Sequence, residues 1–159
     1  MAQFNMPINC KPVEAITPQA GGAITGDWLS TKLVEMVYIV VHINQANAAP
    51  VAITINQATN VAAGSTTPIT AVVPIWANED CATSDLLVEQ TAAVGFTTSA
   101  ATTHKVIVFK VDPAGLAEGF DCLTVITAVS DVANITSAMY YVVPRYTNRV
   151  LTALTAVTD

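Results

Sequence analysis

Two segments near the start of the chain place a hydrophobic residue at every second position. These residues are Val37, Ile39, Val41 and Ile43, followed by Val51, Ile53 and Ile55. The connector between the segments is rich in Asn and Ala and ends in Pro50. A period of two is what a pleated strand needs to point one row of side chains into a core. The pattern therefore predicts two strands, arranged as a hairpin or as neighbours.

Later segments also have hydrophobic patterns that predict strands. Residues 105–111 are hydrophobic at nearly every position, which is typical of a strand covered on both faces. Strands are also predicted over 70–76, with Pro74 at a sheet edge or a bulge, and over 120–130 and 138–143. About eight short strands separated by turn signals predict an all-β, single-domain antiparallel β-sandwich or jelly roll.

The two ends of the chain differ from this central domain, which we predict over residues 22–146. Residues 1–21 carry three prolines and end at the Gly21-Gly22 pair, so we predict that they form an extended N-terminal arm. Phe4, Met6 and Ile8 alternate within the arm, which would allow them to add to the edge of a sheet. Residues 147–159 form a Thr-, Ala- and Val-containing C-terminal tail.

Charge is scarce for a chain of 159 residues. Charged residues are 11% and hydrophobic residues 52% of the total, against about 25% charged in an average soluble domain. Either small polar side chains replace charge on the surface, or partner chains cover much of it. The net charge of −6, with scattered basic residues, argues against nucleic acid and against anionic membranes as partners. The first residues lack the features of a secretory signal and the three cysteines lie far apart, so we expect synthesis in a cytoplasm.

Few residues suggest chemistry. His42 and His104 have no second histidine or acid at metal-ligand spacing, so we interpret both as structural or surface residues. Glu79, Asp80 and Asp85 form the most acidic stretch. These oxygens could serve a calcium ion, but the EF-hand spacing is absent, and a solvated loop or a docking patch for a basic neighbour are the alternatives. We expect no catalytic residues, no metal and no cofactor, and therefore no enzyme.

The whole chain, from its first residues to about Arg145, resembles small virion structural proteins of tailed bacteriophages. The resemblance is closest to capsid decoration proteins, also called cement proteins. It is carried by the runs 4–12 (FNMPINCKP), 21–27 (GGAITGD), 40–45 (VVHINQ), 53–58 (ITINQA), 74–78 (PIWAN) and 119–122 (GFDC).

The resemblance implies a protein that binds the major capsid protein on the outside of the phage head and stabilises the head. It further implies a homotrimer with a jelly roll or related β fold, located on the capsid exterior of the virion. The residues predicted to contact the partner are Phe4, Met6, Ile8, Glu79 and Asp80. The alternatives are a tail or neck component of the virion and, from another class, a cupin-like or glycan-binding module.

Overall fold

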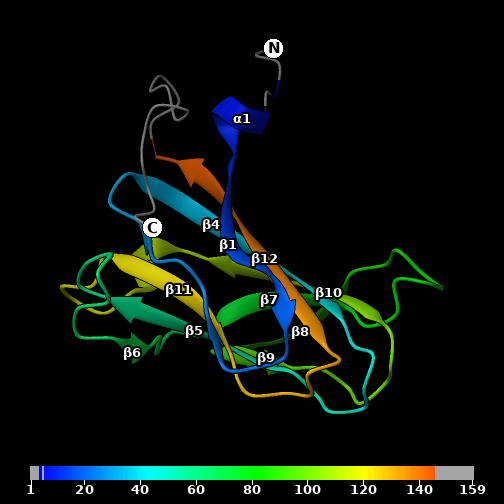
Figure 1. The fold of residues 1–159 in the computed structure, drawn as a ribbon. Helices are drawn as coiled ribbons and strands as arrows, with labels where there is room; N and C mark the ends of the chain where they lie inside the picture. Colours follow the sequence, from blue (N-terminus) through cyan, green and yellow to red (C-terminus); the bar gives the residue numbers. More distant parts are fainter. Residues whose placement is uncertain (1–3, 5, 146–159) are drawn as a thin grey trace.

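Two antiparallel β-sheets face one another across a hydrophobic core, as Figure 1 shows for a computed structural model that describes residue 4 and residues 6–145. Sheet A has the strand order β1-β12-β4-β10-β7-β8. Its strands are β1 (Lys11–Ala20), β12 (Ile135–Pro144), β4 (Val34–Asn44), β10 (His104–Val111), β7 (Val73–Asn78) and β8 (Val88–Ala93). Sheet B has the order β2-β11-β5-β6, with β3 also paired to β11 and β9 to β5. Its strands are β2 (Ile24–Thr25), β11 (Cys122–Thr127), β5 (Ala52–Ala58), β6 (Thr67–Pro68), β3 (Leu29–Ser30) and β9 (Gly95–Thr97).

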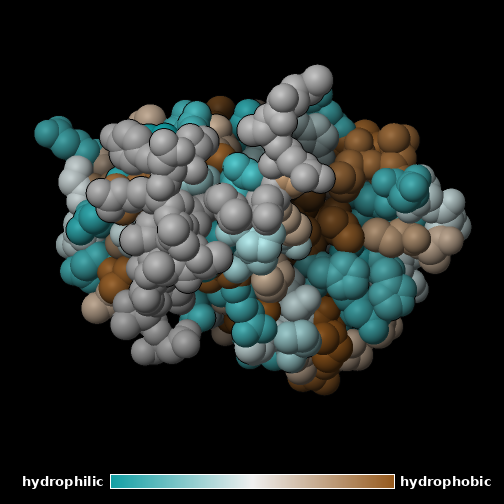
Figure 2. Space-filling model, turned by 90° about the horizontal axis from the view of Figure 1, so that it is seen from above, coloured by the Kyte–Doolittle hydropathy of each residue, from teal (hydrophilic) through white to brown (hydrophobic). Residues whose placement is uncertain are grey.

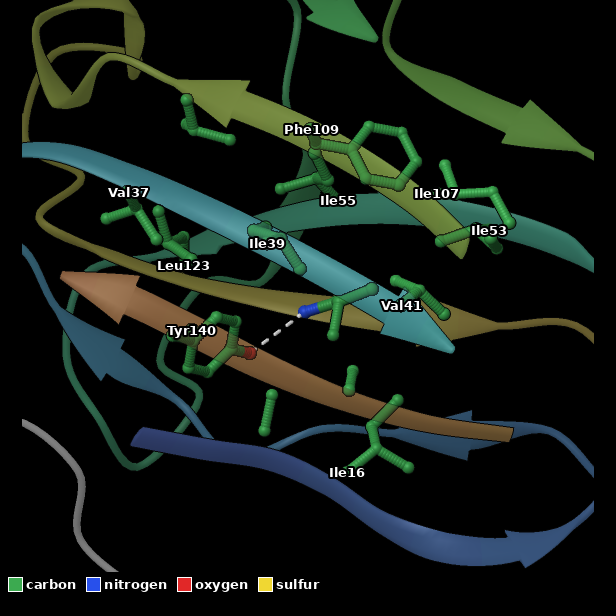
Figure 3. Packing of buried hydrophobic residues seen from close by; sticks show 14 of the residues in the cluster. Ile16, Val37, Ile39, Val41, Ile53, Ile55, Ile107, Phe109, Leu123 and Tyr140 are labelled. Atoms are coloured by element: carbon green, nitrogen blue, oxygen red, sulfur yellow. Dashed lines mark hydrogen bonds between the residues drawn. The ribbon is translucent and has the colours of Figure 1, made fainter. Parts of the chain in front are cut away.

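The predicted all-β sandwich is confirmed, and the alternating residues face its core. Val37, Ile39, Val41 and Ile43 of β4 are all fully buried. Figure 3 shows Val37, Ile39 and Val41 packed between the layers with Ile53 and Ile55 of β5. Alternation therefore identified the inward row of each strand correctly.

The predicted hairpin is wrong. β4 pairs with β10 and β12 in sheet A, whereas β5 pairs with β11 in sheet B. The connector at residues 45–51 therefore crosses from one layer to the other. Both strands have an apolar inward row because they face each other across the core, which gives the same sequence pattern as two paired strands.

The N-terminal segment differs from the predicted arm in two ways. Met6–Asn9 is a short helix, α1, so Met6 and Ile8 do not alternate along an extended strand. Lys11–Ala20 forms β1, the edge strand of sheet A, paired with β12 through two irregularities in register. Pro12 and Pro18 fit an edge position, where a missing backbone donor is tolerated. The part that projects beyond the sandwich thus contains α1 (Met6–Asn9), seen above the sheets in Figure 1.

The prediction for Pro74 holds, and the turn after β10 has a regular cap. Pro74 is exposed and lies at the register shift between Val73 and Ile75, so it marks a bulge. The turn after β10 contains the 3-10 helix η1 (Pro113–Gly115), and the Asp112 carboxylate accepts a hydrogen bond from the Ala114 amide at its start. Asp at the cap and Pro at the first helical position are the usual arrangement.

The sheets are joined by a buried tyrosine. The hydroxyl of Tyr140, on β12, donates to the Asp27 carbonyl at 2.8 Å and accepts from the Val125 amide at 3.1 Å. Val125 lies on β11 between the residues paired to β2 and those paired to β3, where the neighbouring strand is interrupted. The hydroxyl thus supplies a hydrogen-bond acceptor that the interrupted strand does not, as the dashed line in Figure 3 shows.

Candidate functional site

The N-terminal segment exposes large apolar side chains. Phe4 is 70% and Met6 is 42% exposed, and the Cys10 amide donates to the Met6 carbonyl at 2.7 Å to close the helical turn. Ile8 lies in the same turn, but its side chain is outside the described part of the structure. Met6 on a projecting turn and the exposed Phe4 that precedes this turn in the chain are suited to insertion into a hydrophobic pocket of another protein, since aromatic residues and Met are enriched at such contacts.

The acidic loop is engaged within the chain. Glu79 Oε1 accepts from the Ser99 amide at 2.6 Å and lies 3.8 Å from Lys105 Nζ. Asp80 accepts from the Ala82 amide and the Thr83 hydroxyl. Each carboxylate therefore holds local structure, and each is partly exposed. Their predicted contact with a partner stays a prediction.

Lys105 is a buried lysine that joins the loops of Ser99 and Glu79 at one end of the sandwich. Its side chain is fully buried, and Nζ donates to the carbonyl oxygen of Ser99 at 2.8 Å and to the Ser99 hydroxyl at 2.9 Å. Burial lowers the pKa of Lys105, while the nearby Glu79 carboxylate acts to raise it. Lys105 lies two residues before Ile107 and therefore on the inward row of β10, together with Phe109 and Val111. Alternation along the sequence thus indicated that Lys105 is buried, but this burial was not predicted.

Gln45 extends the same polar cluster. Its amide donates to the Ser99 carbonyl at 2.8 Å, and its Oε1 accepts from the Thr98 hydroxyl at 2.7 Å. The Thr98 hydroxyl in turn accepts from the Val51 amide. Since every one of these groups has a partner, the cluster is a structural clamp that fixes the loops at the ends of β4, β7 and β9.

The outward face of sheet A carries an apolar row across its central strands. One row of paired positions crosses the sheet as Trp76 on β7, Val108 on β10, Val40 on β4 and Met139 on β12. The next row contains Lys110, Tyr38 and Tyr141. All seven side chains are only partly buried. By contrast, the outward positions of β5 in sheet B are Ala52, Thr54 and Asn56, as expected for a face in water.

Two open hollows lie on this face of sheet A and share Leu87. One, of about 400 Å³, is lined by Tyr38, Trp76, Leu87, Val108 and Lys110. The other, of about 250 Å³, is lined by Asn78, Cys81, Ser84, Asp85, Leu87 and Val106. We call the two together the outer groove. Along β10 the order Lys110, Val108, Val106 places the lysine at one end of the groove and Asp85 at the other.

A third hollow is small and apolar. It has a volume of about 210 Å³ and is lined by residues that include Met36, Ile69, Val73 and Leu116. Sites for small-molecule ligands usually measure about 300–1,000 Å³ and combine apolar walls with several convergent polar groups. This hollow is therefore a poor candidate for a ligand site.

The remaining reactive groups are separate from one another. His42 and His104 are exposed at outward strand positions. Burial and the neighbouring Asp121 raise the pKa of Cys122 to about 12, which makes its thiol unreactive.

Within residues 4 and 6–145, no group of three or more His, Cys, Asp and Glu side chains is placed to hold a metal ion. Nor does that part of the chain contain a helix long and apolar enough to cross a membrane.

Comparisons with known proteins give little. The sequence matches no model of a protein family, and no curated protein is similar to it. Among solved structures, the crystal structure of SPBc2 prophage-derived protein YomS is similar in chain trace, with a TM-score of 0.49 and 10% sequence identity. The match covers 84% of this chain and 93% of that one. A likeness at this level carries no functional conclusion.

Proposed function

We propose that this protein is a structural component of a bacteriophage virion, a decoration (cement) protein that binds the major capsid protein on the outside of the head. The proposal rests on the sequence resemblance described above. The observation that carries it in the structure is the projecting N-terminal segment, whose Phe4 and Met6 are 70% and 42% exposed.

Two features of the chain agree with such a role. A rigid sandwich with few charges, 11% of residues, suits a module whose surface is largely covered by neighbours in a lattice. The net charge of −6 suits a position outside the capsid better than contact with packaged nucleic acid, whose phosphates repel acidic proteins.

The mechanism is thermodynamic. A protein that binds the assembled lattice and not free subunits stabilises the lattice by mass action, by about 2.7 kcal/mol for each site at a free concentration of 100 times Kd. In this account Phe4, Met6 and Ile8 enter an apolar pocket of the capsid protein, while the sandwich stays folded as a rigid body. Buried aromatic anchors of this kind commonly dominate the energy of an interface.

The test is co-sedimentation of the purified protein with purified phage heads. Deletion of residues 2–9 leaves β1 intact, because β1 begins at Lys11. We expect this variant to lose head binding and keep its thermal unfolding temperature. The double substitution Phe4→Ser with Met6→Ser should behave in the same way. A matched control is Val129→Ser with Val132→Ser, which changes two valines that are 76% and 78% exposed. Unchanged occupancy of heads by the deletion variant would contradict the proposal, and binding to purified tails instead of heads would favour the tail or neck alternative.

A further inference from the structure

We infer that the outer groove on sheet A is a self-association surface, on which a second copy of this chain packs face to face about a two-fold axis. This inference does not rest on the proposed function, because it concerns a different surface from the N-terminal segment. It also departs from the homotrimer that the resemblance implies, since a two-fold axis gives a dimer.

The first argument is that the central strands are apolar on both faces. In β10 the inward Ile107 and Phe109 are fully buried in the core, and the outward Val106 and Val108 are also valines. Such strands usually lie between two covering layers. In the described part of the chain sheet B covers the inner face, while the central outward side chains, such as Trp76, Val108 and Met139, are only partly buried. A Trp, two Tyr, a Met and several Val on an open face favour burial by another protein surface.

Charge then favours a second copy over another partner. Lys110 lines one end of the outer groove and Asp85 the other, with Trp76 and Val108 between them. A two-fold axis through the centre of the groove, between Trp76 and Val108, exchanges its two ends. It therefore places Lys110 of each copy beside Asp85 of the other copy. A two-fold interface is self-complementary in this sense: residue i meets residue j, and j meets i.

The available area sets the expected strength. When the whole outward face of sheet A is buried, six strands about 4.8 Å apart, with three outward rows about 6.8 Å apart, give a face of roughly 600 Å². Two such faces bury about 1,200 Å² in total, which is the lower end for specific interfaces. We therefore expect a dimer that forms in the micromolar range and dissociates on dilution.

The experiment is sedimentation velocity on the full chain from about 1 to 200 µM. The expected result is a monomer–dimer equilibrium. Val108→Lys puts a charge at the centre of the groove, at an outward position where the side chain reaches water in the monomer. It should weaken dimerisation at least about tenfold and leave the circular dichroism spectrum unchanged. Val132→Lys, at a residue that is 78% exposed, is the matched control and should have no effect.

Charge exchange tests the two-fold geometry itself. Lys110→Asp alone and Asp85→Lys alone should each weaken dimerisation, because each brings like charges together across the axis. The double variant should restore it, a result that a general loss of stability would not produce.

Four results would overturn the inference. They are a monomer at all concentrations, a trimer, a dimer insensitive to Val108→Lys, and a double variant no better than the single ones. A chain ending at Arg145 tests another occupant. If only this shortened chain dimerises, residues 146–159 cover the face and the inference fails.

Discussion

The Tyr140 hydroxyl lies 3.1 Å from the Val125 amide nitrogen, and this buried hydrogen bond connects the two sheets of the sandwich. The same hydroxyl donates to the carbonyl of Asp27, so one phenolic group satisfies a donor of β11 and an acceptor at the interruption between β2 and β3.

Replacing Tyr140 by Phe should therefore destabilise the protein. The ring stays in the core, but the Val125 amide and the Asp27 carbonyl lose their partner. We expect a loss of about 1–3 kcal/mol in the free energy of unfolding. Urea titration followed by tryptophan fluorescence measures it. A control is Tyr141→Phe, at the outward neighbouring position, which should change stability by less than about 0.5 kcal/mol. Equal effects of the two substitutions would contradict the assigned role of Tyr140.

Stability should fall at alkaline pH. Burial raises the pKa of Cys122 from 9.0 to about 12 and the pKa of Tyr140 from 10.0 to about 12. Between the ordinary and the raised pKa the unfolded chain has lost the proton and the folded chain keeps it, so folding weakens as pH rises. For each group, the free energy of unfolding should fall by up to about 1.4 kcal/mol per pH unit.

Lys105 has the opposite effect on the pH dependence of stability. Its pKa is lowered by burial, so from that lowered value up to 10.5 the unfolded chain holds the proton and the folded chain releases it. Its contribution to stability therefore rises with pH in that window. Urea titrations from pH 8 to 11 should show a net decline, and Cys122→Ala should make the decline shallower. A decline of the same steepness in the variant would show that Cys122 is not responsible.

The contribution of Glu79 to stability should depend mainly on the presence of Lys105. Glu79→Gln keeps an acceptor for the Ser99 amide but removes the charge 3.8 Å from the buried ammonium group. We expect a cost of about 1 kcal/mol, because breaking a buried pair leaves one charge uncompensated, and Glu79 is itself partly exposed. In a Lys105→Met background the same substitution should cost nothing. Equal costs in both backgrounds would mean that the pair is not coupled.

Gly26 should not tolerate a side chain. An added Cβ would lie 2.9 Å from the Ala15 carbonyl oxygen and 3.0 Å from that of Val125. Both oxygens belong to strand backbone that is hydrogen-bonded in the sandwich. We therefore expect Gly26→Ala to lower the free energy of unfolding by more than about 1 kcal/mol. Gly22→Ala is the matched control, since an added Cβ there meets nothing within 4 Å. Thermal unfolding of both variants checks the difference.

The inward residues of the sandwich could be predicted from sequence, but the pairing of its strands could not. Alternation identifies Val37 and Ile39 as core residues because the period of a strand is two. It says nothing of the partner, since β4 pairs with residues about 65 and 100 positions further along the chain. Pairing over such distances depends on packing between the layers, which no short stretch of sequence contains.

The candidate surfaces were predictable only in part. Exposed Phe4 and Met6 were candidates because an apolar residue outside the domain has no core to enter. The helical turn at Met6–Asn9 was not predicted, because a stretch of four residues is too short to show a helical period. The near-continuous apolar run at 105–111 predicted cover on both faces, and in the described part of the chain sheet B covers the inward face alone. Cover of the outward face stays a prediction, because it would require another molecule and a single chain does not specify one.

The central claim, that this is a decoration protein of a phage head, is tested most directly by electron microscopy of virus particles labelled with an antibody to the protein. Particles released by the cells that make this protein are the sample. The account predicts label spaced over the outer surface of the head. Label confined to the tail or neck, or particles without label, would contradict it.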